Sequence, residues 1–145
     1  SVVDKSSINI KYGGVINPVN LETWEYPGFP TDLQAQWMAY MTQANGASQI
    51  TENIYLDRFT HIGELSRLGA QINLVKNTAN VQGCSRLIGA PVMSTDIRAS
   101  ASLIIAAIAA QGKTEISRIY HIDRGYEEIE KKLSSLGLNI ERLSD

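Results

Sequence analysis

Three arginines of this 145-residue chain stand beside or close to an aspartate, and each is expected just before or within the first turn of a helix. They are Arg58, Arg98 and Arg124. A guanidinium group holds an oxyanion such as phosphate or carboxylate with two parallel hydrogen bonds. A cation at a helix start opposes the helix dipole, unless an anion lies between it and the free amides. The pattern therefore indicates an anion site, and the alternative is local ion pairing with Asp57, Asp96 or Asp123.

Asp32 is a candidate general base, because a carboxylate can take a proton from a substrate hydroxyl. Thr31 and Asp32 precede an apolar stretch, which is also the pattern of a helix N-cap. Taken alone, these residues favour the cap. The two roles can also be divided, with Thr31 capping the helix.

Four short segments recur in the same order, which predicts a duplicated unit of roughly 65 residues. The offset between the copies drifts from 64 to 68. The matching segments are 31–35 with 95–99, 45–46 with 111–112, 57–58 with 123–124, and 68–72 with 136–140.

Hydrophobic spacing and turn residues predict alternating helices and strands within each copy. We expect Leu33, Trp37 and Met41 on one face of the first helix, and an apolar stripe on the last helix. Glycines at 46, 69, 112 and 137 are expected to end the helices. The expected helices span 32–44, 62–68, 96–110 and 124–136, and the expected strands span 7–12, 15–21, 48–55, 71–76, 79–84, 114–120 and 138–143.

The segment 99–110 contains only apolar or small residues, so its helix is expected to be buried on every side. We therefore expect helices inside and sheets outside, in an α/β (α+β) fold. The alternative is a helix that lies under an oligomer or domain interface.

Composition excludes several other classes of protein. With 43% apolar and 19% charged residues the chain has the mix of a globular domain, and its net charge of −2 argues against a protein that coats nucleic acid. Its single cysteine forms no internal disulfide, and two distant histidines make no zinc site. The longest apolar run, 103–110, is far shorter than the roughly 20 residues of a membrane span.

Three motifs resemble those of UDP-N-acetylglucosamine enolpyruvyl transferases, a family also called UDP-N-acetylglucosamine 1-carboxyvinyltransferases. Residues 27–36 resemble its Phe-Pro-Thr-Asp-x-Gln-Ala-Gln motif, and residues 95–101 its Thr-Asp-Leu-Arg-Ala-Ser-Ala motif. Residues 120–127 resemble its His-Ile-Asp-Arg-Gly-Tyr-Glu motif. The last two argue against the related transferase of the shikimate pathway.

The resemblance implies part of an inside-out barrel domain built from repeated βαβαββ units. It covers the carboxy-terminal third of the family's usual length, and the chain begins at Ser1 rather than Met, so we expect a truncated chain. The expected units are residues 22–92 and 93–145, with strands of the preceding unit in 1–21. The remaining domains of the longer enzyme are the expected partners, and the incomplete domain is expected to self-associate.

The resemblance also implies a cytoplasmic enzyme of peptidoglycan synthesis, which transfers the enolpyruvyl group of phosphoenolpyruvate to the 3-hydroxyl of UDP-N-acetylglucosamine. It implies no metal and no organic cofactor. Asp32 matches the base at the sugar hydroxyl, and Arg124 matches the arginine at the carboxylate of phosphoenolpyruvate. Arg58 and Arg98 match arginines of the same cleft, and Ile54 matches a residue whose backbone contacts the UDP-sugar.

The isolated chain is expected to be inactive, because the reactive-loop residues of the family lie outside it. Two alternatives remain from other classes. One is a binding module that recognises a nucleotide sugar without chemistry, and the other is a structural piece that completes a domain with another chain.

Overall fold

A four-stranded sheet covers one side of the computed structural model, which describes residues 7, 9–11 and 13–143. The strand order is β1-β2-β4-β3, with β1 parallel to β2 and the other neighbours antiparallel. Ile50 of β2 and Ala79 and Val81 of β4 face the helices and are fully buried. The strands are β1 (Leu21–Glu22), β2 (Ser48–Thr51), β3 (Ile72–Val75) and β4 (Thr78–Val81).

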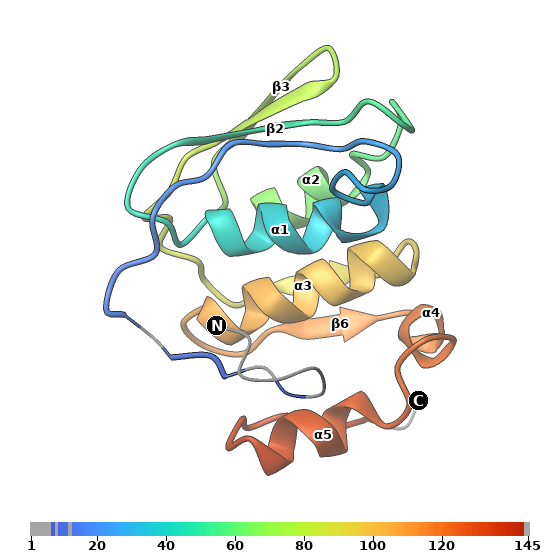
Figure 1. Ribbon diagram of the computed structural model, residues 1–145. Helices are drawn as coiled ribbons and strands as arrows, with labels where there is room; N and C mark the ends of the chain where they lie inside the picture. The colour runs from blue at the N-terminus through green and yellow to red at the C-terminus, as the bar shows by residue number, and fades with distance from the viewer. Residues whose placement is uncertain (1–6, 8, 12, 144–145) are drawn as a thin grey trace.

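Three helices lie between this sheet and a second, two-stranded parallel sheet (Figure 1). The helices are α1 (Gln34–Met41), which follows a 3-10 turn (Thr31–Leu33), α2 (His61–Arg67) and α3 (Ile97–Ala109). The second sheet pairs β5 (Pro91–Met93) with β6 (Glu115–Ser117). Two short helices, α4 (Tyr120–Asp123) and α5 (Ile129–Ser135), complete the chain. The predicted α/β class, with helices inside and sheets outside, is confirmed.

The contact between α1 and α3 forms the centre of the core. Small residues at 99–102 of α3 are buried, and they allow the two helix backbones to approach closely. Leu103 of α3 and Met38 of α1 are fully buried there, and Ala39 and Ala106 are 1% exposed.

The buried face of α1 differs from the predicted one. Leu33 is 48% exposed and Trp37 is half-buried, whereas Ala35, Met38 and Met41 are buried. Residues 31–33 form a 3-10 turn, which has fewer residues per turn than an α-helix and so shifts the phase of the helix that follows.

The predicted helix 124–136 is wrong, because the chain forms two helices joined by a loop. Glu128 has a φ of 45°, in the left-handed region, directly before α5. Gly125 lies so close to α3 that a Cβ there would be 2.2 Å from Ile97 Cδ1. The packing of α4 on α3 therefore turns the chain away from its local helical pattern. In the last helix, Ile129 and Leu133 are half-buried and Leu136 is 78% exposed.

Strands at the two ends of the chain also differ from expectation. Residues 138–143 form no strand, and of 15–21 only Leu21 joins the sheet. Residues 8 and 12 of the expected strand 7–12 lie outside the described residues, and the others are not in a strand. β5 was not predicted, and it crosses the expected unit boundary between 92 and 93.

Full burial of α3 on every side was also an incorrect prediction. Ile108 is 50% exposed, and Ile104, Ile105 and Ala107 are only half-buried. No helix of the described residues combines the length and the apolar character needed to cross a membrane.

Leu103→Ala is expected to lower the free energy of unfolding by about 3 kcal/mol, because it leaves a cavity at the centre of the helix layer. Ile108→Ala, on the exposed face of the same helix, is the matched control and should cost about 1 kcal/mol or less. Chemical denaturation of both variants measures the difference. Equal losses would contradict the assigned core.

Candidate functional site

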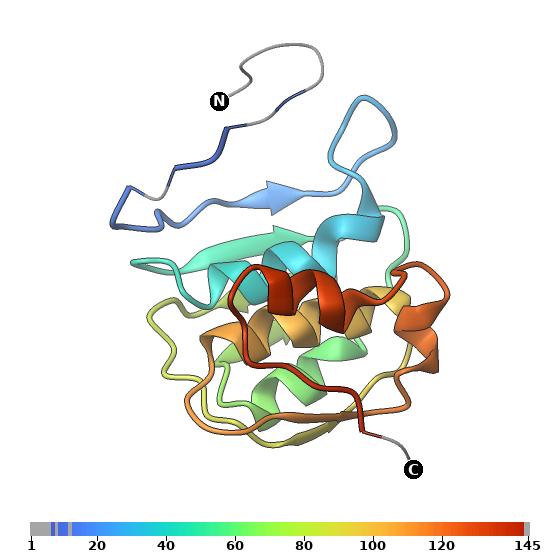
Figure 2. The same cartoon turned by 90° about the horizontal axis from the view of Figure 1, so that it is seen from below.

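The amino-terminal ends of α1, α2 and α3 lie at one edge of the molecule (Figures 1 and 2). Side chains from these three ends line a pocket. The polar and charged residues that matter here are Thr31, Arg58, His61, Asp96 and Arg98.

Asp32 joins two of the predicted arginines at this edge. Its Oδ1 accepts a hydrogen bond from Arg58 Nη1 at 2.8 Å and another from Arg98 Nε at 2.6 Å. The hydrogen bond from Arg98 lowers the pKa of the Asp32 carboxyl; burial opposes this effect, and the charges of Arg98 and Arg58 and the hydrogen bond from Arg58 add to it, so the pKa is lowered overall. Within the described residues no donor reaches Oδ2, and the side chain is 66% exposed. A carboxylate is thus held ionised beside two cations, with one oxygen open to solvent.

The two Thr-Asp pairs of the repeat have different roles. Asp96 caps α3, because its Oδ1 accepts from the backbone N–H groups of Arg98 (2.7 Å) and Ala99 (3.1 Å). Neither Thr31 nor Asp32 caps a helix through its side chain. The predicted cap at position 32 is therefore wrong, and the Asp32 carboxylate is available for other partners.

The alternative of local ion pairing is not found for two of the three arginines. Arg58 pairs with Asp32 rather than with its neighbour Asp57. Asp123 pairs with Arg142 at 2.7 Å rather than with Arg124. Only Arg98 keeps a local partner, Asp96, at the longer distance of 3.9 Å.

A buried carboxylate that sequence analysis missed holds these elements together. Glu52 is fully buried after β2, and its Oε1 accepts from Thr23 Oγ1 (2.7 Å) and from the backbone N–H groups of Ile54 (2.9 Å) and Tyr55 (3.0 Å). Its Oε2 accepts from Thr31 Oγ1 at 2.8 Å. Burial raises the pKa of Glu52, but the hydrogen bonds together outweigh burial and lower it.

Through Thr31 this carboxylate reaches the site. Thr31 Oγ1 also accepts from Arg58 Nη1 at 3.0 Å, so Glu52, Thr31 and Arg58 form one continuous network. The Arg58 guanidinium also lies over the ring of Tyr55, 4.0 Å from its centroid. A single charged residue inside the otherwise uncharged predicted strand 48–55 is the sequence signal that could have identified Glu52.

Ile54 lies within this same turn and is half-buried. Its backbone N–H is occupied by Glu52. The side chain is not part of the pocket lining.

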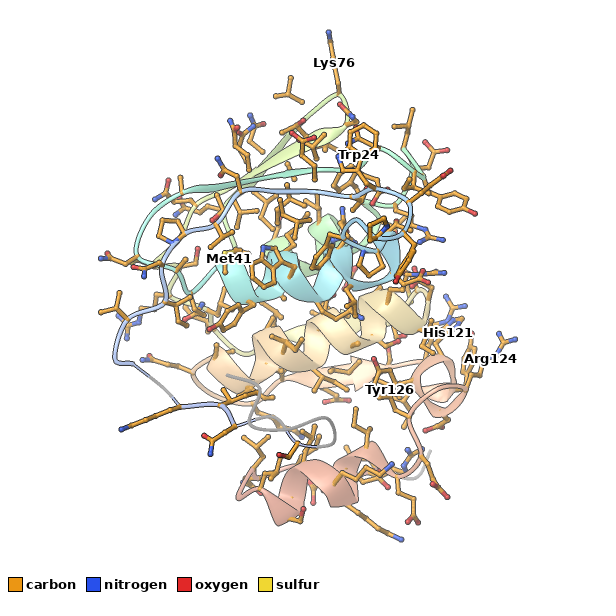
Figure 3. The ribbon with its side chains drawn as sticks, in the orientation of Figure 1. Trp24, Met41, Lys76, His121, Arg124 and Tyr126 are labelled. Atoms are coloured by element: carbon orange, nitrogen blue, oxygen red, sulfur yellow. The ribbon has the colours of Figure 1, made fainter. Side chains whose placement is uncertain are left out.

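Arg124 lies at the same edge but outside this network. It directly follows α4 and extends away from the helix core (Figure 3). It is therefore not at a helix start, as predicted, but at a helix end, where the dipole favours a cation. The packing of Gly125 against Ile97 places α4 beside the start of α3, which carries Arg98. In the described part of the chain Arg124 forms no ion pair, so its charge is available.

His61 is a second group that the sequence did not single out. Its side chain lines the pocket, the residue is 3% exposed, and its Nε2 has no hydrogen-bond partner among the described residues. Burial lowers the pKa of His61 to about 4, against a smaller opposing effect of the Asp96 charge. At neutral pH His61 is therefore uncharged, and it lines the pocket together with the positively charged side chains of Arg58 and Arg98.

Within the described residues, no group of three His, Cys, Asp or Glu side chains could hold a metal ion.

His61 should make the protein less stable in mild acid. Its pKa in the unfolded chain is near 6.5, so between pH 6.5 and about 4 the unfolded chain binds a proton that the folded chain does not. The contribution of neutral His61 to the free energy of unfolding is fully present above pH 6.5. It is lost, by about 3 kcal/mol in total, as the pH falls to about 4. His61→Gln should reduce this loss when both proteins are unfolded with denaturant at several pH values. An unchanged pH dependence would contradict the burial of a neutral His61.

Comparison with curated proteins identifies relatives whose sequences are more than 50% identical to this chain. UDP-N-acetylglucosamine 1-carboxyvinyltransferase of Chlorobium phaeovibrioides is 59% identical over 94% of this chain and 32% of its own length. The enzyme of the same name from Rhodopseudomonas palustris is 57% identical over 98% of this chain and 33% of its own length. The chain thus spans about a third of the length of these relatives.

Solved structures agree on the fold. The enolpyruvyl transferase NikO from Streptomyces tendae superimposes with a TM-score of 0.80 at 28% identity, over 88% of this chain and 30% of that one. EPSP synthase from Acinetobacter baumannii gives a TM-score of 0.64 at 15% identity, over 88% of this chain and 29% of its own, which supports the fold alone. The family model described as EPSP synthase (3-phosphoshikimate 1-carboxyvinyltransferase) matches residues 2–133. The chain therefore belongs to the EPSP synthase family of enolpyruvyl transferases.

Proposed function

We propose that this chain forms one wall of the active site of a UDP-N-acetylglucosamine 1-carboxyvinyltransferase. The reaction joins the 3-hydroxyl oxygen of UDP-N-acetylglucosamine to C2 of phosphoenolpyruvate and then releases phosphate, as a cytoplasmic step of peptidoglycan synthesis. The observation that carries the proposal is the Asp32 carboxylate held between Arg58 and Arg98. It lies in the motif shared with the family, and relatives at 54–59% identity carry this enzyme's name.

Asp32 is the proposed base. Attack by the sugar hydroxyl requires the loss of its proton, and a positioned carboxylate accepts such a proton in the transition state. Among the described residues Oδ2 accepts no hydrogen bond, and the side chain is 66% exposed, so a substrate hydroxyl can approach it. Hydrogen bonds from Arg58 and Arg98 to Oδ1 fix the orientation of the group.

The arginines are the proposed binding groups for the two anionic ends of phosphoenolpyruvate. Arg124, which forms no ion pair with the residues that the structure describes, is assigned to the carboxylate. Arg58 and Arg98 are assigned to the phosphate, for which a guanidinium fork is well suited. Ile54 is assigned to a backbone contact with the UDP-sugar, and since its N–H is occupied, its carbonyl is the group left for that contact.

We further propose that residues 22–92 and 93–145 belong to two repeated units. The order β1, α1, β2, α2, β3, β4 supports a complete βαβαββ unit. The parallel pair β5–β6 around α3 has the same arrangement as β1–β2 around α1. This supports a second unit that begins with β5, so the proposed boundary moves from 92/93 to just before Pro91. The remaining domains of the enzyme are the proposed partners of this chain.

Replacing the matching third of the Chlorobium phaeovibrioides relative with this chain should give an enzyme that releases phosphate when both substrates are present. Asp32→Asn in this chimera should lower kcat by about 10²- to 10⁴-fold, because the amide keeps the shape but cannot take the proton. Steady-state phosphate release measures both enzymes.

Asp57→Asn, at an exposed carboxylate with no ion pair among the described residues, is the matched control and should keep the parent kcat. The isolated 145-residue chain should show no turnover, because it supplies only one wall of the cleft. A kcat unaffected by Asp32→Asn would exclude the assigned base.

Arg124→Ala in the same chimera should raise KM for phosphoenolpyruvate about ten- to hundred-fold, through loss of a charge-assisted hydrogen bond. Arg86→Ala is the control, because Arg86 is exposed, binds Gln111 beyond the carboxy-terminal end of α3, and lies away from the pocket. The test is a steady-state measurement of KM for each substrate. Equal effects of the two variants on KM would show that Arg124 does not bind phosphoenolpyruvate.

A further inference from the structure

Two guanidinium groups share a single carboxylate oxygen, Asp32 Oδ1, at the edge of the pocket. We propose that Asp32 is an internal stand-in for a phosphorylated ligand: a phosphate that binds Arg58 and Arg98 displaces Asp32 from them and frees its carboxylate for the sugar hydroxyl. This inference rests on the proposed function and adds a coupling between the two substrates.

The order of burial supports an exchange of partners. The side chains of Arg58 and Arg98 are 22% and 34% exposed, whereas that of Asp32 is 66% exposed. The cations thus form the inner part of the site and Asp32 lies on its solvent side. An anion that enters from solvent meets the group it must replace before it reaches the cations.

The surrounding contacts determine which groups stay and which can leave. Arg58 is retained by Thr31 Oγ1 and by the ring of Tyr55, neither of which depends on Asp32. Asp96, 3.9 Å from Arg98, is committed to the amides at the start of α3. His61 is neutral near pH 7 because burial lowers its pKa to about 4. Asp32 is therefore the carboxylate of the described site that can be exchanged.

The energies favour the exchange. The Asp32 carboxylate of both ion pairs is 66% exposed, and an ion pair with such access to water contributes little to stability, so its loss costs little. A phosphate carries more charge than a carboxylate and can form parallel hydrogen bonds with a guanidinium group. The same two arginines thus gain by changing partner.

The exchange makes the basicity of Asp32 depend on the binding of the phosphorylated substrate. While both arginines bind Oδ1, the hydrogen bond from Arg98 and the two positive charges lower the pKa of Asp32, which makes it a weak base. When the arginines turn to a phosphate, this effect is removed and an anion is added nearby. Asp32 then becomes a stronger base only when the phosphorylated substrate is in place.

Titration of the 145-residue chain with inorganic phosphate tests the exchange, with the Nε–H signals of Arg58 and Arg98 followed by nuclear magnetic resonance. Asp32→Asn should bind phosphate about two- to five-fold more tightly than the parent, because the competing internal anion is gone. Asp57→Asn removes the same charge one residue from Arg58 and should tighten binding clearly less. At saturating phosphate, the carboxyl ¹³C signal of Asp32 should titrate at a higher pH than without phosphate.

Three outcomes would overturn the proposal: equal tightening in the two variants, a phosphate complex in which the Asp32 titration does not move, or no perturbation of either guanidinium by phosphate. None of these measurements involves the sugar or turnover. The exchange can therefore fail while the assignment of Asp32 as base in the chimera stands, and the converse also holds.

Discussion

Two positive charges brought together at the edge of a small domain require an anion between them, and in this chain Asp32 provides it. Its partners come from distant parts of the sequence, 26 residues away for Arg58 and 66 for Arg98. The carboxylate therefore links the start of α1 to the loop before α2 and to the first turn of α3. The arrangement of the three inner helices and the charge balance of the site thus depend on each other.

Beneath this surface pair lies the buried carboxylate of Glu52, which performs a different task. It satisfies two backbone amides of a tight turn and two threonine hydroxyls, so that the loop carrying Arg58 is fixed relative to the turn carrying Asp32. A buried charge is tolerable when it accepts several hydrogen bonds. Both carboxylate oxygens of Glu52 thus accept hydrogen bonds. The Asp32 side chain, by contrast, is exposed, and its Oδ2 accepts no hydrogen bond from the described residues.

Much of this could be predicted from the sequence, because repeats and periodicity report local structure. The helix at 97–109 and the strands β2, β3 and β4 follow from hydrophobic spacing and turn residues, whereas a common cleft for Asp32, Arg58 and Arg98 was implied by the family resemblance. The ion pairs could not be predicted, because Arg58 pairs with Asp32, 26 residues away, rather than with its sequence neighbour Asp57. Likewise, the break after α4 depends on the contact of Gly125 with Ile97, which no local pattern contains.

The sheet order has a consequence for how the protein is made. All four strands of the larger sheet lie between residues 21 and 81, so this sheet can form while the rest of the chain is still being synthesised. Glu52, Thr31, Asp32 and Arg58 all belong to that early part. Arg98 arrives later with α3, and the second cation is therefore added to a half-site that already exists on the emerging chain.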